Sequence, residues 1–422
     1  MRSGRVVSKM GVRWVCAAAF AAAQLPAVAW AAGWDTPILY TARHMGMGGT
    51  AVGYVDDPSA AFHNPAGLQG IRGLTLLGDF SLVLAKLRTS PDNSAKTIES
   101  NTIVAPFPML AAGYRLHEWV SVGVAGFPIA SGAAEYDYQN IRGREIKDET
   151  QVLFVEGTVL ASINVPEDEL IPGKLSIGGG WRVTHVTLNR DKTYLLDLDL
   201  NGTNWSGFRL GIQYRPIPEL SLGAAYRSKI DVIADGDDGL ALAQVQNPEF
   251  DFLLPQKYTF GARFDWERFG VAADYEFTDQ SQNDSQELRG DIGGNPVSVD
   301  QIFNWRDGHT IRAGVEYRVT ATGGFVPVRA GYVFDGRVSD PAYPSAFGTP
   351  PSATNSITLG VGYVRDTWQV NAAGAYRFGG TTVEASELGS GCDALCAKDG
   401  DYRVRAVGLY VDGSVRFDVA GL

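Results

Sequence analysis

The chain has 422 residues and carries a formal net charge of −11 at pH 7. This acidic balance argues against nucleic acid as a partner. Beyond the first 31 residues, no apolar run approaches the roughly 18 residues that a membrane-spanning helix requires. The sequence therefore predicts neither a nucleic-acid-binding protein nor, in its mature form, a helical membrane protein.

Residues 1–31 have the three parts of a secretory signal peptide. Four basic residues precede the alanine-rich apolar stretch Trp14–Val28, and small residues at the spacing of a cleavage site end at Ala29 and again at Ala31. We predict cleavage rather than a retained anchor, because the apolar stretch is short. Since the segment has four basic residues and no acidic ones, its removal would lower the net charge from −11 to −15.

The segment Met45–Leu68 begins with a glycine cluster and contains two sites where a short polar residue precedes proline. At Asp57 and again at Asn64, the pair has the form of a helix N-cap followed by proline at the first helical position. The two resulting helical turns are too small to bury a core of their own. Small flanking residues permit close backbone approach, so we expect the segment to pack inside a larger structure. The residues we single out are Gly46, Gly48, Gly49, Asp56, Asp57, Asn64, Pro65, Ala66 and Gly67.

From Gly73 onward, apolar or aromatic residues alternate with small or polar ones. Many such segments run about 10–16 residues, the length of a tilted membrane-spanning strand, and their apolar face often ends in tyrosine or tryptophan. A soluble sandwich also alternates, but its strands are shorter. Five segments share one scheme: FRLGIQY (Phe208–Tyr214), LSLGAAY (Leu220–Tyr226), YTFGARF (Tyr258–Phe264), IRAGVEY (Ile311–Tyr317) and ITLGVGY (Ile357–Tyr363).

About fourteen strands can be counted. They begin near residues 74, 101, 119, 150, 175, 203, 219, 251, 269, 308, 325, 354, 368 and 402. Short turns such as Leu116–Trp119 alternate with long polar loops such as Thr278–Asp307, which is typical of an outer-membrane barrel. The sequence thus predicts an all-β fold, a transmembrane antiparallel β-barrel of about 14 strands with a small N-terminal helical hatch plugging the lumen. We expect a signal peptide at residues 1–31, the hatch at 32–73 and the barrel at 74–422.

The chain resembles a known family. Its hatch stretch, MGMGGT…DD…NPAGL, resembles the N-terminal hatch of the FadL/TodX family. Ala105–Ala130 and Phe252–Phe264 are similar to that family's second hairpin and to its later LP-x-x-(Y/F)-x-x-G segment. Members are outer-membrane channels for long-chain fatty acids and other hydrophobic compounds. The resemblance implies a monomeric, multi-pass barrel in the cell outer membrane of a Gram-negative bacterium, with a hydrophobic small-molecule ligand, outer-membrane lipid around it and no cofactor.

The resemblance also implies a route of passive uptake. In that family, ligand is captured at extracellular loops, passes to a pocket near the hatch and leaves sideways through a gap made by a kinked third strand. The matching kink is Gly126, Phe127 and Pro128, since proline cannot donate to a strand ladder. The alternative, equally open at this point, is that Pro128 merely ends its strand at the extracellular rim.

Two further sets of residues are candidates for ligand binding. Apolar residues between the seventh and eighth strands form either a hydrophobic capture patch or a loop tucked over the barrel mouth. These residues are Leu240, Leu242, Val245, Leu253 and Leu254. Among recurring inward-facing arginines, the candidates to receive a ligand carboxylate are Arg182, Arg209 and Arg312. The alternative, which we favour, is that the inward arginines pair with Asp56, Asp57 and Glu316 to hold the hatch.

Catalysis and metal binding find little support. The five histidines are scattered, and none lies at a metal-ligand spacing or beside a plausible nucleophile, so we expect neither an enzyme nor a metal site. Cys392 and Cys396 lie four residues apart in an exported chain, and we predict that they form a small loop disulfide.

The rival functional class is a PorV-like barrel, which has a similar hatch sequence and acts as a scaffold or shuttle in protein secretion. The proline-bearing third strand and the apolar loop before the eighth strand favour transport over this alternative.

The last aromatic residue is Phe417, five residues before the end of the chain, whereas barrel chains usually finish on an aromatic residue. The sequence therefore leaves the end of the fourteenth strand open.

Overall fold

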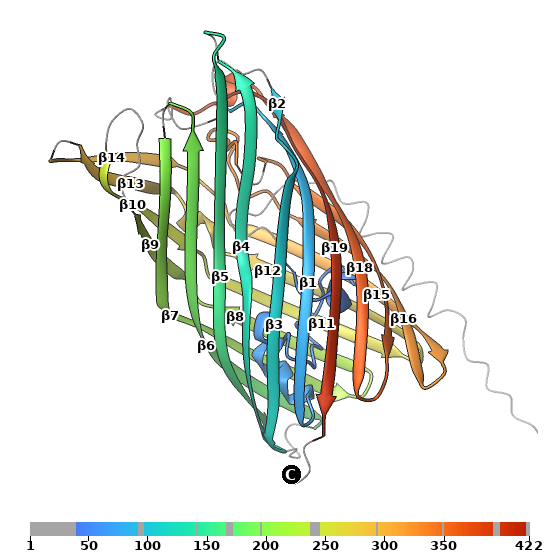
Figure 1. Ribbon diagram of the computed structural model, residues 1–422. Coiled ribbons are helices and arrows are strands. Elements are labelled where there is room, and N and C mark those ends of the chain that lie inside the picture. The colour runs from blue at the N-terminus through green and yellow to red at the C-terminus, as the bar shows by residue number, and fades with distance from the viewer. Residues whose placement is uncertain are drawn as a thin grey trace, which may run out of the picture.

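The computed structural model describes residues 39–91, 97–140, 142–165, 172–194, 196–236, 245–292, 294–347, 350–390 and 397–418. It is a closed antiparallel barrel that surrounds a short helical segment (Figure 1). Outside the described part lie the predicted signal peptide, the side chain of Val245 and the residues Leu240, Leu242, Cys392 and Cys396. None of the described helices is long and apolar enough to cross a membrane.

Three helical turns precede the first strand: α2 (Ala42–Met45), α3 (Ala60–His63) and η2 (Pro65–Gly70). The strands of the described residues then follow in order: β1 (Leu74–Thr89), β2 (Ile98–Glu99), β3 (Ile103–His117), β4 (Val120–Gln139), β5 (Glu145–Val165), β6 (Lys174–Lys192), β7 (Leu196–Ile217), β8 (Leu220–Arg227), β9 (Ile230–Gly236), β10 (Val245–Leu254), β11 (Lys257–Trp266), β12 (Phe269–Thr278), β13 (Ser285–Ile292), β14 (Asn295–Ile302), β15 (Gly308–Ala321), β16 (Gly324–Asp335), β17 (Thr354–Val364), β18 (Trp368–Val383) and β19 (Gly400–Phe417). Two more helical turns lie in loops, η3 (Gln280–Gln282) and η4 (Ala385–Glu387).

These strands make fourteen spans around the barrel. β1 pairs with β3 on one side and with β19 on the other, which closes the wall. β2 is a short piece at the end of β1. Four spans are divided in two: β8 with β9, β10 with β11, β12 with β13 and β14 with β15. The division between β10 and β11 follows Pro255, which has no N–H to donate to a ladder. The predicted fold class is confirmed.

Several strands are longer than the sequence pattern indicated. The expected loop Thr278–Asp307 contains η3 and the β13–β14 hairpin, and the loop expected between the third and fourth spans is mostly strand, since β4 reaches Gln139. Most residues of β14 are exposed, so no buried face imposes an apolar alternation on its sequence. At the other end of the chain, β19 finishes at Phe417, which settles the end of the fourteenth span.

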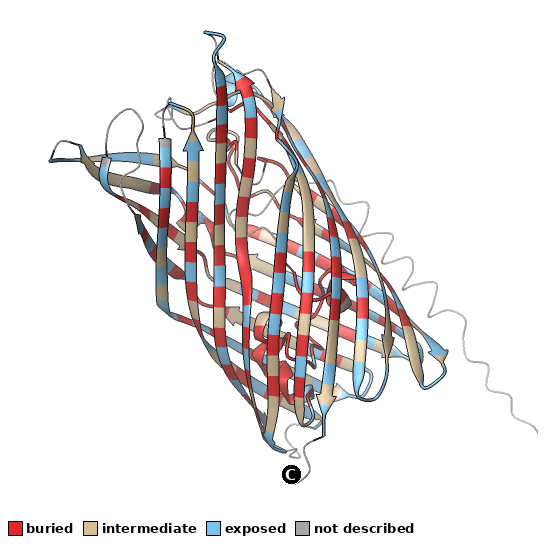
Figure 2. Cartoon of the chain, in the orientation of Figure 1, coloured by how far each residue is buried: buried red, intermediate tan, exposed pale blue. Residues whose placement is uncertain are grey.

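The apolar side of the wall faces outward. In β15, Ile311 and Val315 are 51% and 49% exposed, whereas Arg312 and Glu316 are only 3% and 6% exposed. Figure 2 shows this alternation as bands of buried and exposed residues along the strands. A soluble sheet would bury its apolar face instead. Outward apolar and inward polar residues are the arrangement of a barrel whose surroundings are lipid.

The hatch, here residues 39–73, lies within the barrel and approaches the wall most closely at inward-facing glycines. A Cβ atom at Gly223 would lie only 2.2 Å from the carbonyl oxygen of Val52. We call the glycines with such hatch contacts the seat glycines: Gly113, Gly123, Gly178, Gly211, Gly223, Gly261, Gly314, Gly331 and Gly360. Any side chain there would take the space of the hatch. Each of the five repeated sequence segments contributes one seat glycine.

Replacing Gly223 with valine is expected to keep the hatch from seating while the barrel still forms. The added Cβ would meet backbone atoms of Val52 and Gly53, which cannot turn aside, and overpacking of this kind costs about 1–3 kcal/mol. Gly374→Val is the matched control, because the nearest atom to a Cβ there lies 4.0 Å away. We expect higher ion conductance in planar bilayers for Gly223→Val alone, with heat-modifiable gel migration retained by both variants. Equal conductance of the two variants would contradict the seat assignment.

Candidate functional site

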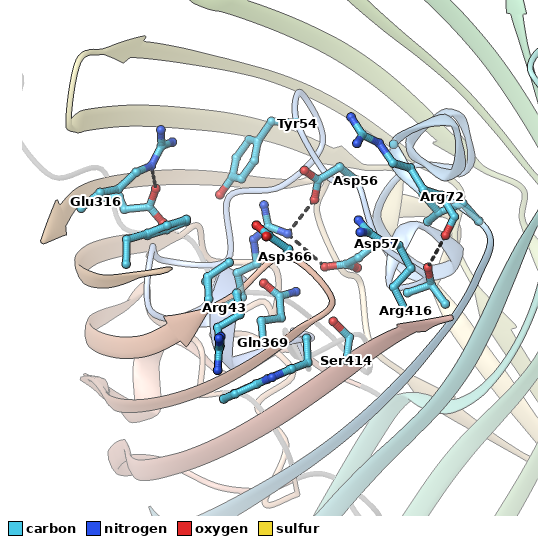
Figure 3. A pocket seen from close by; sticks show the side chains of 18 of the residues that line it. Arg43, Tyr54, Asp56, Asp57, Arg72, Glu316, Asp366, Gln369, Ser414 and Arg416 are labelled. Carbon is cyan, nitrogen blue, oxygen red and sulfur yellow. Dashed lines mark hydrogen bonds and ion pairs between the residues drawn. The ribbon is translucent and has the colours of Figure 1, made fainter. Parts of the chain in front are cut away.

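On its periplasmic side, where the short turns lie, the hatch borders a charged cavity of about 520 Å³ (Figure 3). Eight arginines and five acidic residues line this cavity, which we call the periplasmic vestibule. Arg43 of the hatch lies among them, with its Nη1 atom 2.6 Å from Asp56 and 3.2 Å from Asp57. An apolar solute entering the vestibule would strip water from charged groups without replacing their hydrogen bonds, so this side offers it no favourable path.

The inward arginines of the wall are paired with acidic residues. Glu156 on β5 accepts hydrogen bonds from Arg182 at 2.7 Å and from Arg209 at 2.8 Å, and all three side chains are buried. Arg312 on β15 lies 3.2 Å from Glu276 on β12. Each of the three arginines that the sequence offered as carboxylate receptors therefore already has a carboxylate partner in the wall, and Arg182 and Arg209 share a single one.

The predicted partners of these arginines need correction. Glu316 does pair with Arg263 and Arg329, at 2.8 Å each, as expected. Asp56 and Asp57 instead pair with Arg43, because the hatch folds its own arginine back onto them. The aspartate pair thus stabilises the hatch internally and does not fasten it to the wall.

Asn64, which the sequence singled out, joins the hatch to β7 and β8. Its Nδ2 lies 3.0 Å from the carbonyl oxygen of Ile212 and 3.4 Å from that of Ala224. Within the hatch it also donates to the Val52 carbonyl oxygen at 2.8 Å, and its Oδ1 accepts from the Ala66 amide. The last bond is the N-cap of η2 that the Asn-Pro pair predicts. Pro65 and Ala66 lie against seat glycine Gly178, which explains why small residues occur there.

Three wall aspartates that sequence reasoning missed hold backbone amides of the hatch. Asp274 on β12 accepts from the amides of Ala51 and Val52, at 2.8 and 3.2 Å. Asp412 on β19 accepts from the Arg43 amide at 2.7 Å, and Asp79 on β1 accepts from the Ala42 amide at 3.3 Å. All three carboxylates are buried. The available signal was an acidic residue at an inward position of each strand.

On the opposite side of the hatch lies a mostly apolar cavity of about 150 Å³. Leu39 and Met45 of the hatch form its floor, and inward residues of β1, β3, β4 and β16–β19 form its walls. The guanidinium of Arg377 reaches the lining but is held by Asp335 at 2.9 Å and by Thr354 at 3.0 Å. We call this space the apolar cavity, and it is the part of the lumen suited to a hydrophobic molecule.

The wall of the apolar cavity includes an interrupted ladder at the predicted kink. Pairing between β3 and β4 stops at Leu110 and Gly126, and the β4–β5 register shifts between Pro128 and Ala130. Beyond the kink, β4 continues to Gln139, so the interpretation that Pro128 merely ends its strand is wrong. The unpaired stretches of β3 and β4 both line the apolar cavity. We call this interruption the β3–β4 seam.

An aromatic group of the hatch lies against the seam. The Tyr40 hydroxyl donates to the carbonyl oxygen of Pro128 at 2.9 Å. The rings of Tyr40, Phe62 and Phe127 pack together, with centroids 5.3–5.8 Å apart. The hatch therefore supplies both a hydrogen bond and apolar packing to the edge that the kink leaves unpaired.

The predicted capture residues within the described chain lie on β10. Leu254 is buried in the luminal core, whereas Leu253 points the other way, as alternation along a strand requires. Further along β10, Phe252 packs edge-on against Phe154 of β5, with ring centroids 5.5 Å apart. Leu254 thus belongs to an apolar luminal lining, and a role in capture remains a prediction.

The chain is similar to known proteins over most of its length. A family described as "Outer membrane protein transport protein (OMPP1/FadL/TodX)" matches residues 22–417. A FadL homologue of Pseudomonas aeruginosa is 15% identical with a TM-score of 0.69, covering 92% of this chain and 100% of that one. The Pseudomonas putida toluene transporter TodX is 17% identical with a TM-score of 0.67 and the same coverage. The Ralstonia pickettii toluene transporter TbuX is 17% identical with a TM-score of 0.63, covering 90% and 98%.

A search of curated protein sequences finds no match. The family match extends over both the hatch and the whole barrel, and the solved barrels agree with this chain in fold. The chain therefore belongs to the OMPP1/FadL/TodX family of outer-membrane transport proteins.

Proposed function

We propose that this protein is a passive outer-membrane channel that takes up hydrophobic small molecules and releases them sideways through the β3–β4 seam. One observation carries the proposal: the apolar cavity borders the seam, whereas the periplasmic exit is a charged vestibule. Residues 1–31 would be its cleaved signal peptide, 32–73 its hatch and 74–422 its barrel. The secretion-scaffold alternative is not favoured by the family match or by the structural neighbours.

The direction of release follows from the cost of each path. A molecule leaving the apolar cavity toward the periplasm must displace the hatch and cross the vestibule, where its apolar surface is exposed to water at about 25 cal/mol per Å². A molecule leaving through the seam enters the hydrocarbon of the bilayer and keeps that surface out of water. The sideways path requires only local separation of strand segments that share no ladder bonds.

A crosslink across the seam is expected to stop uptake. Continuing the register from Leu110 and Gly126 places Ala105 opposite Ser131, and both residues line the apolar cavity. We would replace this pair with cysteine in a background lacking Cys392 and Cys396, and then close it with a short bifunctional thiol reagent that reductant cleaves. Uptake of radiolabelled toluene and hexadecanoate by whole cells should fall to the level of cells without the protein and recover after reduction.

The matched control places the crosslink where the ladder is intact. Ala111 and Ala125 are direct partners on the same two strands, so joining them closes nothing that was open. Uptake should be unchanged in that pair. Full uptake with the Ala105–Ser131 pair crosslinked would overturn lateral release while leaving the channel function in place. Absence of uptake even in the uncrosslinked protein would count against the channel itself.

Buried histidines make retention of the hatch depend on pH. His63 contacts the carbonyl oxygen of Tyr40, and burial lowers the pKa of His63 to about 3. In a displaced hatch this pKa would return to about 6.5. The seated hatch therefore favours neutral His63, and its full stability is present above pH 6.5. Below that pH, stability is lost by about 1.4 kcal/mol per pH unit until His63 itself is protonated near pH 3.

Acidification from pH 7 to pH 5 is accordingly expected to loosen the hatch and raise ion conductance in planar bilayers. His63→Gln retains a donor toward Tyr40 but cannot take up a proton, so its conductance should change less over the same range. Burial raises the pKa of Asp57, which acts in the opposite sense, and the comparison with the variant isolates the histidine. An identical pH response in the two proteins would exclude His63 as the cause.

A further inference from the structure

We propose that basic side chains on the outward face of β1 and β19 bind the phosphate group of a lipid headgroup in the outer leaflet of the outer membrane. These two strands are neighbours where the wall closes (Figure 1). The side chains are Lys86, Arg88, Arg403 and Arg405, which we call the rim cluster. The inference rests on membership of an outer-membrane family and is independent of the proposed route of uptake.

The first support is the height of the rim cluster on the wall. On the periplasmic side of the cluster, the outward residues of both strands are apolar or glycine, from Leu76 to Leu84 and from Val415 to Val407. From Leu76 to Lys86 the strand rises about 26 Å, at about 3.4 Å per residue and a tilt of about 40°. The apolar band of such a barrel is about 25 Å tall. The rim cluster, at the long-loop end of β1, therefore lies level with the outer-leaflet headgroups.

The second support is that like charges lie opposite each other. Lys86 is the direct ladder partner of Arg405, and Arg88 is the direct partner of Arg403. Direct partners have Cβ atoms about 4.5–5.5 Å apart, and like charges at such positions destabilise a sheet. Snorkelling toward water accounts for a single basic residue at a membrane rim, but not for two opposed pairs. An anion bound between the strands would remove the repulsion.

The third support is that acidic residues compensate only half of the cluster. Asp401 lies 3.4 Å from Arg403 and 4.0 Å from Arg88, the row nearer the loops. Within the described chain, no carboxylate forms an ion pair with Lys86 or Arg405, which are exposed and nearer the apolar band. Two such cations match a phosphomonoester, whose charge at pH 7 is about −1.5 to −2. A phosphodiester headgroup, with its single charge, would compensate only one of them.

The fourth support is an open groove of about 450 Å³ beside the cluster, lined by Arg403, Arg405 and residues of β18. Gly380 lies opposite Arg403, and a Cβ atom there would be 2.6 Å from the Cγ atom of Arg403. The glycine therefore lets the stem of this arginine lie across β18. Phe378, the direct partner of Arg405, adds an exposed ring to the lining. The groove thus combines guanidinium groups with an apolar contact, as a phosphorylated lipid requires.

The test is native mass spectrometry of the intact protein, purified free of lipid, with lipid A as the probe because it carries phosphomonoesters. Lys86→Gln with Arg405→Gln should weaken lipid A binding about ten- to thirtyfold, since one basic residue near a membrane surface contributes about fivefold. Lys174→Gln with Arg268→Gln is the matched control, because these exposed residues lie at the periplasmic rim, and its binding should be unchanged. Equal weakening in the two double variants would overturn the assignment to the rim cluster.

Other probes separate the possible ligands. Lipid A without its phosphate groups should bind about tenfold more weakly than lipid A, and phosphatidylglycerol, a phosphodiester, should lie between the two. Equal binding of lipid A with and without phosphate would overturn phosphate recognition. Displacement of lipid A by an equimolar amount of inorganic phosphate would indicate a site for a free anion and overturn the lipid assignment.

A measurement on the unaltered protein keeps the proposal testable if the double variant does not fold. Bound lipid A should slow acetylation of the Lys86 amine by a water-soluble reagent, whereas Lys174 should react at an unchanged rate. Glu99→Gln removes the carboxylate opposite Arg88 and should tighten lipid A binding. Acetylation of Lys86 at the same rate with and without lipid A would overturn the proposal.

Discussion

The structure depends on one constraint: the hatch lies inside a polar lumen with its backbone in close contact with the backbone of the wall. The hatch has few intact helical turns, so many of its amides need partners outside the segment. The wall provides them through Asp79, Asp274 and Asp412, and it provides clearance through the seat glycines. Without the seat glycines, wall side chains would hold the hatch too far from the aspartates. Without the aspartates, the buried amides of the hatch would lack hydrogen-bond acceptors.

This seating explains why the two sides of the hatch differ so sharply. The periplasmic side collects charged groups of the hatch and of the turns around a cavity of about 520 Å³. The opposite side is sealed by Leu39 and Met45, so the space above them is mostly apolar. A barrel of this width is too wide for wall side chains alone to fill, and the hatch divides the lumen into a charged compartment and a mostly apolar one.

Local sequence signals predicted the parts of the structure that are repeated or capped. Strand starts near residues 74, 269, 308, 354 and 368 coincide with β1, β12, β15, β17 and β18, because apolar residues alternate with small or polar ones along most of each strand. The Asn64 cap was predictable because a cap acts within three residues. The wall aspartates were not, because one acidic residue in a strand names no partner until the hatch is placed. The β13–β14 hairpin was missed because its residues lack a buried face.

The sequence predicted where the kink lies but could not predict its effect on strand pairing. Pro128 identified the position. The hydrogen-bonding register then shows that β4 continues past Pro128, whereas its pairing with β3 stops there. The wall also has a second weak place, between β7 and β9, where few ladder pairs remain. There the wall supplies its own bonds, from the Asn204 side chain to the Asp231 carbonyl oxygen and from the Phe208 amide to the Ser228 hydroxyl oxygen.

At the β3–β4 seam, by contrast, the bond to the kink comes from Tyr40, which belongs to the hatch and not to the wall. The wall bonds across the β7–β9 interruption and also across the far end of the seam, where the Asn101 amide donates to the Glu135 carbonyl oxygen at 2.8 Å, whereas the bond at the kink itself depends on where the hatch sits. A ligand in the apolar cavity touches both Leu39, next to Tyr40, and the unpaired edges of the seam. Any shift of the hatch that makes room for the ligand would also withdraw the Tyr40 bond to Pro128 at the sideways exit that we propose.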